Sequence, residues 1–144
     1  MTNKLRSTQG LSRVEFFCII GICAAAVFFI ISGIFWYRDR QLKAEDTLMV
    51  NTAESVAISN TLSGLCPVRG CDGGASCTHK TADNTYVGYF SHPLNTIGGD
   101  LPKGYNSYKT MTIGDKTYHG EPGTMVIKVE MKDGELTLSW VKGR

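Results

Sequence analysis

Three cysteines and a histidine lie close together in the middle of the chain, where they could bind a metal or form a disulfide: Cys66, Cys71, Cys77 and His79. The spacing supplies four possible zinc ligands but lacks the close C-x-x-C pair of common zinc modules. Outside the cytoplasm a disulfide is favoured, with one thiol left over, and it would stabilise a small domain by about 2–3 kcal/mol. We therefore treat the three cysteines as disulfide candidates with the pairing open, and we expect no metal and no cofactor.

A single carboxylate stands at the edge of a long apolar run. Glu15 directly precedes residues 16–37, in which Ser32 is the only polar residue. An ionised carboxylate in hydrocarbon costs on the order of 3 kcal/mol, so such residues usually have a function. Glu15 could be neutralised by a positive group in a water-free assembly. Alternatively, Glu15 and Arg13 could both extend to the lipid headgroups.

Patterns of known catalytic or nucleic-acid-binding proteins are absent from the sequence. It contains no Ser-His-Asp nucleophile motif, no phosphate-binding loop and no helical histidine pair. The chain has 15 basic and 13 acidic residues, and the basic excess comes from Lys4 and Arg6 within the first ten residues. We therefore expect neither an enzyme nor a protein that binds nucleic acid by its charge.

The apolar run itself is a membrane or targeting segment. Its 22 residues would form a helix roughly 33 Å long, close to the thickness of the hydrocarbon core. A cleaved secretory signal could end at the three alanines 24–26, but the chain then stays apolar as far as residue 37. An ordinary single-pass anchor is a second interpretation, and similar numbers of basic residues on its two sides leave its direction open.

A third interpretation comes from the residues that precede the run. Lys4 and Arg6 form a short basic leader that ends at Gly10, and Glu15 follows five residues later. This arrangement resembles the type IV prepilin family of pilins and pseudopilins, whose leader is cleaved after a glycine and whose mature chain has glutamate at its fifth position. The resemblance implies cleavage between Gly10 and Leu11, a usually N-methylated amine on Leu11, and a role for Glu15 in assembly. The chain departs from the family at Arg13, where the family is apolar.

The next elements follow from helical periodicity. No proline precedes Pro67, so we predict one helix over residues 11–63, ending at Gly64. Its second half is amphipathic. The apolar residues predicted to face a core are Leu42, Met49, Ala53, Val56 and Leu62, with Val50, Ala57 and Leu65 beside them. The charged residues predicted on the other faces are Arg40, Lys43, Glu45, Asp46 and Glu54.

The rest of the chain predicts a small antiparallel sheet. Residues 65–84 and 91–106 are rich in turn-forming residues and are expected to be loops. Strands are predicted at residues 86–90, 108–113, 116–119, 124–131 and 135–141. Gly114-Asp115 and Lys132-Asp133-Gly134 are predicted hairpin turns.

These elements predict an α+β fold, in which a long N-terminal helix packs its amphipathic half on a small antiparallel sheet. The expected divisions are a leader (1–10), a transmembrane and assembly half of the helix (11–37), an amphipathic half (38–65) and a globular head (66–144). This is also the layout of the pilin family.

The resemblance implies a structural subunit of a type IV pilus or a type II secretion-like filament, as a minor pilin or pseudopilin. The implied partners are other pilin subunits, a prepilin peptidase, the assembly platform and the membrane, with nucleic acid only where the filament serves DNA uptake. The implied location is the bacterial inner or cytoplasmic membrane, with a single pass and the head outside the cytoplasm, and the filament at the cell surface or in the periplasm. The alternative is a bitopic membrane protein with an exported α+β binding domain that does not polymerise.

Overall fold

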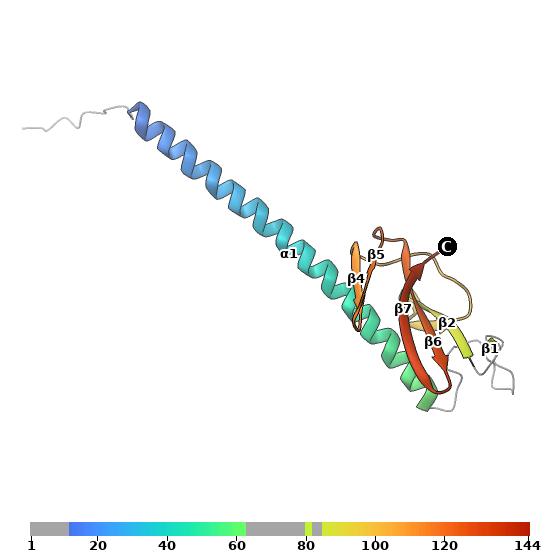
Figure 1. The fold of residues 1–144 in the computed structure, drawn as a ribbon. Coiled ribbons are helices and arrows are strands. Elements are labelled where there is room, and N and C mark those ends of the chain that lie inside the picture. Colours follow the sequence, from blue (N-terminus) through green and yellow to red (C-terminus); the bar gives the residue numbers. More distant parts are fainter. Residues whose placement is uncertain (1–11, 63–79, 82–84) are drawn as a thin grey trace, which may run out of the picture. The chain divides into compact units, whose positions relative to one another are not determined.

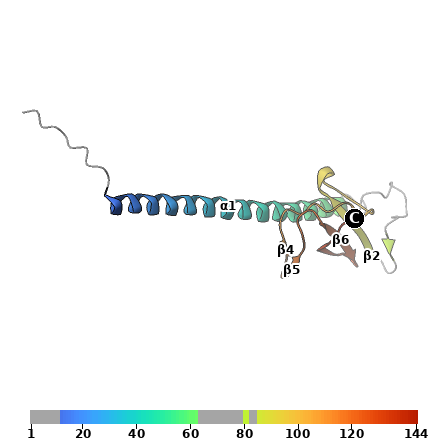
Figure 2. The same ribbon diagram turned by 90° about the horizontal axis from the view of Figure 1, so that it is seen from above.

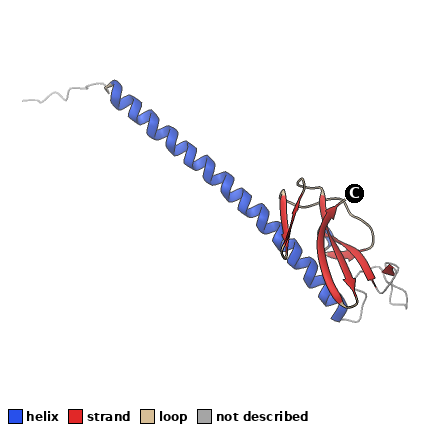
Figure 3. Ribbon diagram, in the orientation of Figure 1, coloured by secondary structure: helices blue, strands red, loops and turns tan. Residues whose placement is uncertain are grey.

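The computed structural model describes residues 12–62, 80–81 and 85–144, and its fold class is α+β. One long helix is accompanied by short strands (Figure 3). The chain divides into two units, Met1–Arg38 and Asp39–Arg144. In chain order (Figure 1), the elements are α1 (Arg13–Leu62), β1 (Lys80–Thr81), β2 (Thr85–Ser91), the 3₁₀ helix η1 (His92–Leu94), β3 (Thr96–Gly98), β4 (Thr110–Ile113), β5 (Lys116–His119), β6 (Met125–Lys132) and β7 (Glu135–Lys142).

The helix α1 is continuous over 50 residues. It begins at Arg13 and ends at Leu62, within two residues of the bounds predicted from the sequence. The absence of proline explains its continuity, because proline removes a backbone donor and clashes with the preceding turn. Gly21 and Gly33 lie inside the helix without interrupting it.

The strands form two antiparallel sheets in the second unit. The larger has the order β1-β2-β6-β7, with β3 also paired to β2, and the smaller is the β4–β5 hairpin. Strands β6 and β7 are joined by Asp133 and Gly134, whose positive φ angles of 50° and 88° suit a tight two-residue hairpin turn. Lys132, predicted to be part of this turn, instead pairs with Glu135 as the last residue of β6.

Two segments predicted to be loops contain short elements. The predicted loop 91–106 contains η1 and β3, and the predicted loop 65–84 contains β1. Strand β3 forms because Ile97 pairs opposite Phe90 of β2 and both side chains are fully buried. A three-residue strand of this kind depends on its neighbour more than on its own sequence, so the local turn signals concealed it.

The core of the second unit lies between the C-terminal half of α1 and the sheets. Figure 2 shows β4, β5 and β6 on one side of this half of the helix. The core consists of Met49, Ala53, Ala57, Phe90, Ile97, Met111, Ile127, Val129 and Trp140. The prediction that the amphipathic half of the helix packs on a small sheet is confirmed.

The helical stripe that faces this core differs from the predicted one at Leu42, Asp46 and Leu62. Leu42 was predicted to face the core but is only half-buried and does not belong to it. The buried residues of α1 are Asp46, Met49, Ala53 and Ala57, which recur every three or four residues. Leu62 was predicted to face the core but is 83% exposed as the last residue of the helix. Asp46 was predicted to lie on an outer face but is only 3% exposed, because its carboxylate has polar partners inside the protein.

The connection before β4 is held to β6 by a buried asparagine. The Oδ1 atom of Asn106 accepts hydrogen bonds from the backbone N–H groups of Thr124 and Met125, at 3.0 and 2.7 Å. Its Nδ2 donates to the backbone carbonyl of Tyr108 at 2.8 Å. Gly104 permits this close approach, since a Cβ there would lie 2.3 Å from the backbone of Thr124. These contacts fix the segment that carries Ser107 and Tyr108.

Candidate functional site

Glu15 lies in the first turn of α1, and its carboxylate bonds back to the start of the helix. The backbone N–H of Ser12 donates to Oε2 of Glu15 at 2.8 Å, and the backbone N–H of Glu15 donates to Oγ of Ser12 at 3.3 Å. This reciprocal pair is a capping box, which satisfies N–H groups that have no partner within the helix. The S-x-x-E spacing is its sequence signal, and neither interpretation of Glu15 given above included this role.

The apolar half of α1 exposes its side chains in every direction. Every residue from Phe16 to Tyr37 is exposed, and Phe29 reaches 73%. The helix is long and apolar enough to cross a membrane, with a mean hydropathy of 2.7 over its most apolar window. Moving one large apolar side chain out of water is favourable by about 1.5–3 kcal/mol, so an apolar environment would strongly stabilise a helix with this surface. The chain is therefore compatible with a single-pass membrane protein.

The other predicted site residues, Gly10, Leu11, Cys66, Cys71 and Cys77, lie outside the described residues, as does His79. The cleavage and the disulfide therefore stay predictions. Within the described part of the chain, Cys18 and Cys23 are free thiols. Those same residues contain no group of three or more His, Cys, Asp or Glu side chains that could hold a metal ion.

The buried carboxylate of Asp46 joins the helix to the connection that precedes β4. Its Oδ1 accepts a hydrogen bond from the backbone N–H of Ser107 at 2.6 Å, and its Oδ2 accepts one from Tyr108 at 2.9 Å. Burial raises the pKa of Asp46 above its ordinary value, although the two hydrogen bonds oppose this and the charge of Glu45 adds to it. Both oxygens are thus occupied by backbone donors.

One helical turn earlier, an ion pair lies beside the ring of Tyr108. Nζ of Lys43 is 3.0 Å from Oδ2 of Asp39 and 4.7 Å from the centre of that ring. The Tyr108 hydroxyl and the Lys43 ammonium lower the pKa of Asp39, and the Asp39 carboxylate and Tyr108 raise the pKa of Lys43. The pair is exposed to solvent, so it contributes little to stability. The ion pair therefore matters mainly for local charge, because the carboxylate of Asp39 balances the positive charge of Lys43.

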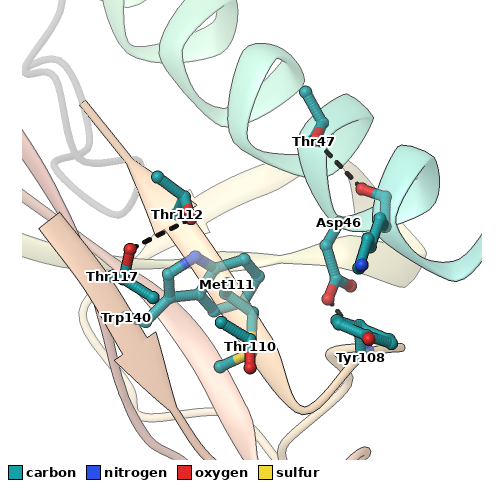
Figure 4. Close-up of a pocket in the computed structure, with 9 residues that line it drawn as sticks. Asp46, Thr47, Tyr108, Thr110, Met111, Thr112, Thr117 and Trp140 are labelled. Carbon is teal, nitrogen blue, oxygen red and sulfur yellow. Dashed lines mark hydrogen bonds between the residues drawn. The ribbon is translucent and has the colours of Figure 1, made fainter. Parts of the chain in front are cut away.

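A cavity of about 460 Å³ lies between this part of α1 and the smaller sheet (Figure 4). It is lined by Lys43, Asp46, Thr47, Tyr108, Thr110, Met111, Thr112, Thr117 and Trp140. Hydroxyl groups predominate among the polar side chains, and those of Thr112 and Thr117 are 3.4 Å apart across the β4–β5 hairpin. The lining can therefore donate and accept hydrogen bonds at several points.

One polar atom at this cavity has no partner. Trp140 is 3% exposed, and its buried Nε1 makes no hydrogen bond to any of the described residues. A buried donor without an acceptor costs about 1–3 kcal/mol. In Figure 4 the indole nitrogen lies on the edge of the ring that faces Thr112 and Thr117. Sequence reasoning placed Trp140 in a strand but gave no signal that its nitrogen would border a cavity.

No family model matches this chain, and no curated protein or solved structure is detectably similar to it.

Proposed function

We propose that this protein is a structural subunit of a type IV pilus or a type II secretion-like filament, either a minor pilin or a pseudopilin. In this proposal a prepilin peptidase cleaves the precursor between Gly10 and Leu11 in the bacterial inner or cytoplasmic membrane. The head lies outside the cytoplasm, and the filament extends to the cell surface or remains in the periplasm. The partners are other pilin subunits and the assembly platform.

The order of features along α1 carries this proposal. Glu15 stands in the first turn, and an uninterrupted run of exposed apolar side chains, residues 16–37, follows it directly. The second half of the same helix, from Asp39 onward, belongs to the unit that contains the sheet. A filament subunit needs these three parts in this order: a charged start that sets register, an apolar rod that packs with its copies, and a head.

The chemistry of assembly follows from the low dielectric of a packed apolar core. A lone carboxylate is unfavourable there, and a positive group within a few ångströms stabilises it. The α-ammonium of Leu11 on a neighbouring subunit would pair with Glu15 and so fix the axial step between subunits. Close van der Waals packing of the apolar run would supply most of the cohesion, because lipid tails are as apolar as the helix itself.

The capping box favours a second candidate, a bitopic membrane protein with an exported binding domain that does not polymerise. In that protein Glu15 would serve only its own helix, through its bond to the N–H of Ser12. The two candidates therefore differ in what the negative charge of Glu15 does beyond capping.

Two substitutions separate the charge of Glu15 from its capping role. Glu15→Gln removes the charge and retains a side chain that suits a capping box, whereas Ser12→Ala removes the cap and retains the charge. We expect Glu15→Gln to lower the amount of protein in sheared filaments at least tenfold and Ser12→Ala to leave it near the wild-type level. Intact mass and N-terminal sequencing of each variant from the native membrane check that processing at Leu11 is unchanged.

The outcomes distinguish the candidates directly. An N-terminus at Leu11, together with loss of filament incorporation in Glu15→Gln alone, supports the filament subunit. Equal losses in both variants would mean that capping, and not charge, matters for assembly. An N-terminus at Met1 or Thr2, together with no wild-type protein in the sheared filaments, would favour the bitopic membrane protein.

A further inference from the structure

We propose that the cavity beside Trp140 is a binding site for a neutral, hydroxyl-rich ligand, namely a saccharide unit with a carbonyl or hydroxyl oxygen that accepts a hydrogen bond from the indole N–H. The site lies wholly within the second unit, Asp39–Arg144. It goes beyond the proposed filament role, because ligand binding by the head does not require the subunits to assemble.

The indole nitrogen of Trp140 is a buried donor without an acceptor among the described residues. Nε1 of Trp140 can only donate a hydrogen bond, and none of the described residues accepts one from it. The hydroxyls of Thr112 and Thr117, on the side of the cavity that the nitrogen faces, are 3.4 Å apart. Bonds between hydroxyl groups are usually 2.7–2.8 Å long, so this one is weak and easily replaced. A ligand oxygen that replaces this contact would bond to both hydroxyls and, with a small rearrangement that opens the buried Nε1, to the indole N–H.

The charges around the cavity favour a neutral ligand. The ammonium of Lys43 is 3.0 Å from the carboxylate of Asp39, so an anion would find no free cation here. The carboxylate of Asp46 would repel an anion further. Both of its oxygens already accept backbone hydrogen bonds, so it also offers little to a cation.

Size and lining agree with a saccharide. A cavity of about 460 Å³ lies within the range that holds small organic ligands, about 300–1,000 Å³. Threonine hydroxyls act as both donors and acceptors, which matches the mixed character of sugar hydroxyls. Met111 and the ring of Tyr108 border the same space and provide apolar contact for the carbon skeleton of a sugar ring.

The test follows the indole N–H of Trp140 by ¹H–¹⁵N NMR on the full chain in detergent micelles. The sequence contains two tryptophans, so Trp36→Phe leaves one indole signal and does not alter the head. The probe is N-acetylglucosamine, which carries an amide carbonyl and several hydroxyls. We expect a saturable shift of the indole signal with a Kd in the millimolar range. In Thr112→Val/Thr117→Val the Kd should rise at least tenfold.

The matched control is Thr137→Val, because Thr137 is an exposed threonine on the same strand as Trp140 and does not line the cavity. It should leave the Kd unchanged. No shift at concentrations up to about 50 mM, well above a millimolar Kd, would overturn the proposal. So would a shift produced by glucuronate but not by N-acetylglucosamine, or an unchanged Kd in the double variant. The proposal would also fail if the ligand-free indole signal showed a hydrogen bond that the double variant removes, since a threonine would then be the acceptor.

Discussion

The two halves of α1 have the same backbone conformation and opposite relations to their surroundings. Residues 16–37 expose apolar side chains on all sides, whereas the half beyond Asp39 buries one narrow stripe and exposes the rest. The buried stripe is covered by the sheet of the same chain. The apolar half has no comparable cover among the described residues of its own unit, which is compatible with a membrane-spanning segment. Helical structure alone therefore does not tell what stabilises a helix; the distribution of apolar side chains around it does.

The sharpest way to test this contrast is to truncate a phenylalanine in each region. Phe90 is fully buried in the core of the head, and Phe16 is half exposed at the start of the apolar run. We expect Phe90→Ala to lower the free energy of unfolding of the head by about 3–5 kcal/mol, through lost burial and the cavity left behind. Phe16→Ala should leave that free energy within about 0.5 kcal/mol of wild type. Urea unfolding in micelles, followed by tryptophan fluorescence, measures both.

A charge placed in the apolar half should have the next largest effect, and in the opposite region. Val27 is near the centre of the run, where an arginine costs about 3 kcal/mol on insertion. Val27→Arg should therefore shift the protein from the membrane fraction to the soluble or degraded fraction and leave the unfolding of the head unchanged. Val27→Leu is the control. Full membrane retention of Val27→Arg would contradict a transmembrane role for this half.

The carboxylate that ties the second half of the helix to the head should have a smaller effect. Asp46→Ala leaves the partly buried N–H groups of Ser107 and Tyr108 without their acceptor. We expect a loss of about 2 kcal/mol in the free energy of unfolding. Glu45→Ala, one residue away and exposed, should change it by less than about 0.5 kcal/mol. Equal effects of the two substitutions would show that Asp46 does not hold the helix to the head.

The smallest expected effect is a pH dependence that comes from the same residue. Burial raises the pKa of Asp46 in the folded protein above its ordinary value of 3.8, so the folded state binds this proton more tightly than the unfolded state. The stability that this provides is fully present below pH 3.8 and is lost as the pH rises through the folded-state pKa. The destabilisation caused by Asp46→Asn should therefore shrink between about pH 3 and pH 7. If it grows instead, the two hydrogen bonds to the carboxylate outweigh its burial.

Much of the fold could be predicted from the sequence because its signals are local. The continuous helix follows from the absence of proline before Pro67. Both hairpins follow from glycine-containing turns between two segments that have strand-forming residues. The predictions were wrong where the structure of a residue depends on a segment far away in the sequence. Asp46 was assigned to an outer face because it is charged. It is buried instead, because backbone N–H groups 61 and 62 residues away in the sequence donate hydrogen bonds to its carboxylate. Strand β3 forms only because β2 lies beside it.

Of the two candidate sites, one could be predicted from local sequence and the other could not. The position of Glu15 before the apolar run could be read from the sequence, and so could its S-x-x-E capping spacing, because both depend on residues within one helical turn. The cavity beside Trp140 could not, since its walls come from α1, the connection before β4, and the strands β4, β5 and β7. Composition and periodicity by themselves determined a long helix, an apolar segment of membrane length and a small antiparallel sheet. Only the tertiary structure decided that the buried face of the helix includes Asp46 and leaves out Leu62, and that the indole nitrogen of Trp140 has no partner among the described residues. Local signals fix backbone conformation, whereas burial and hydrogen bonding of a side chain depend on what the rest of the chain brings beside it.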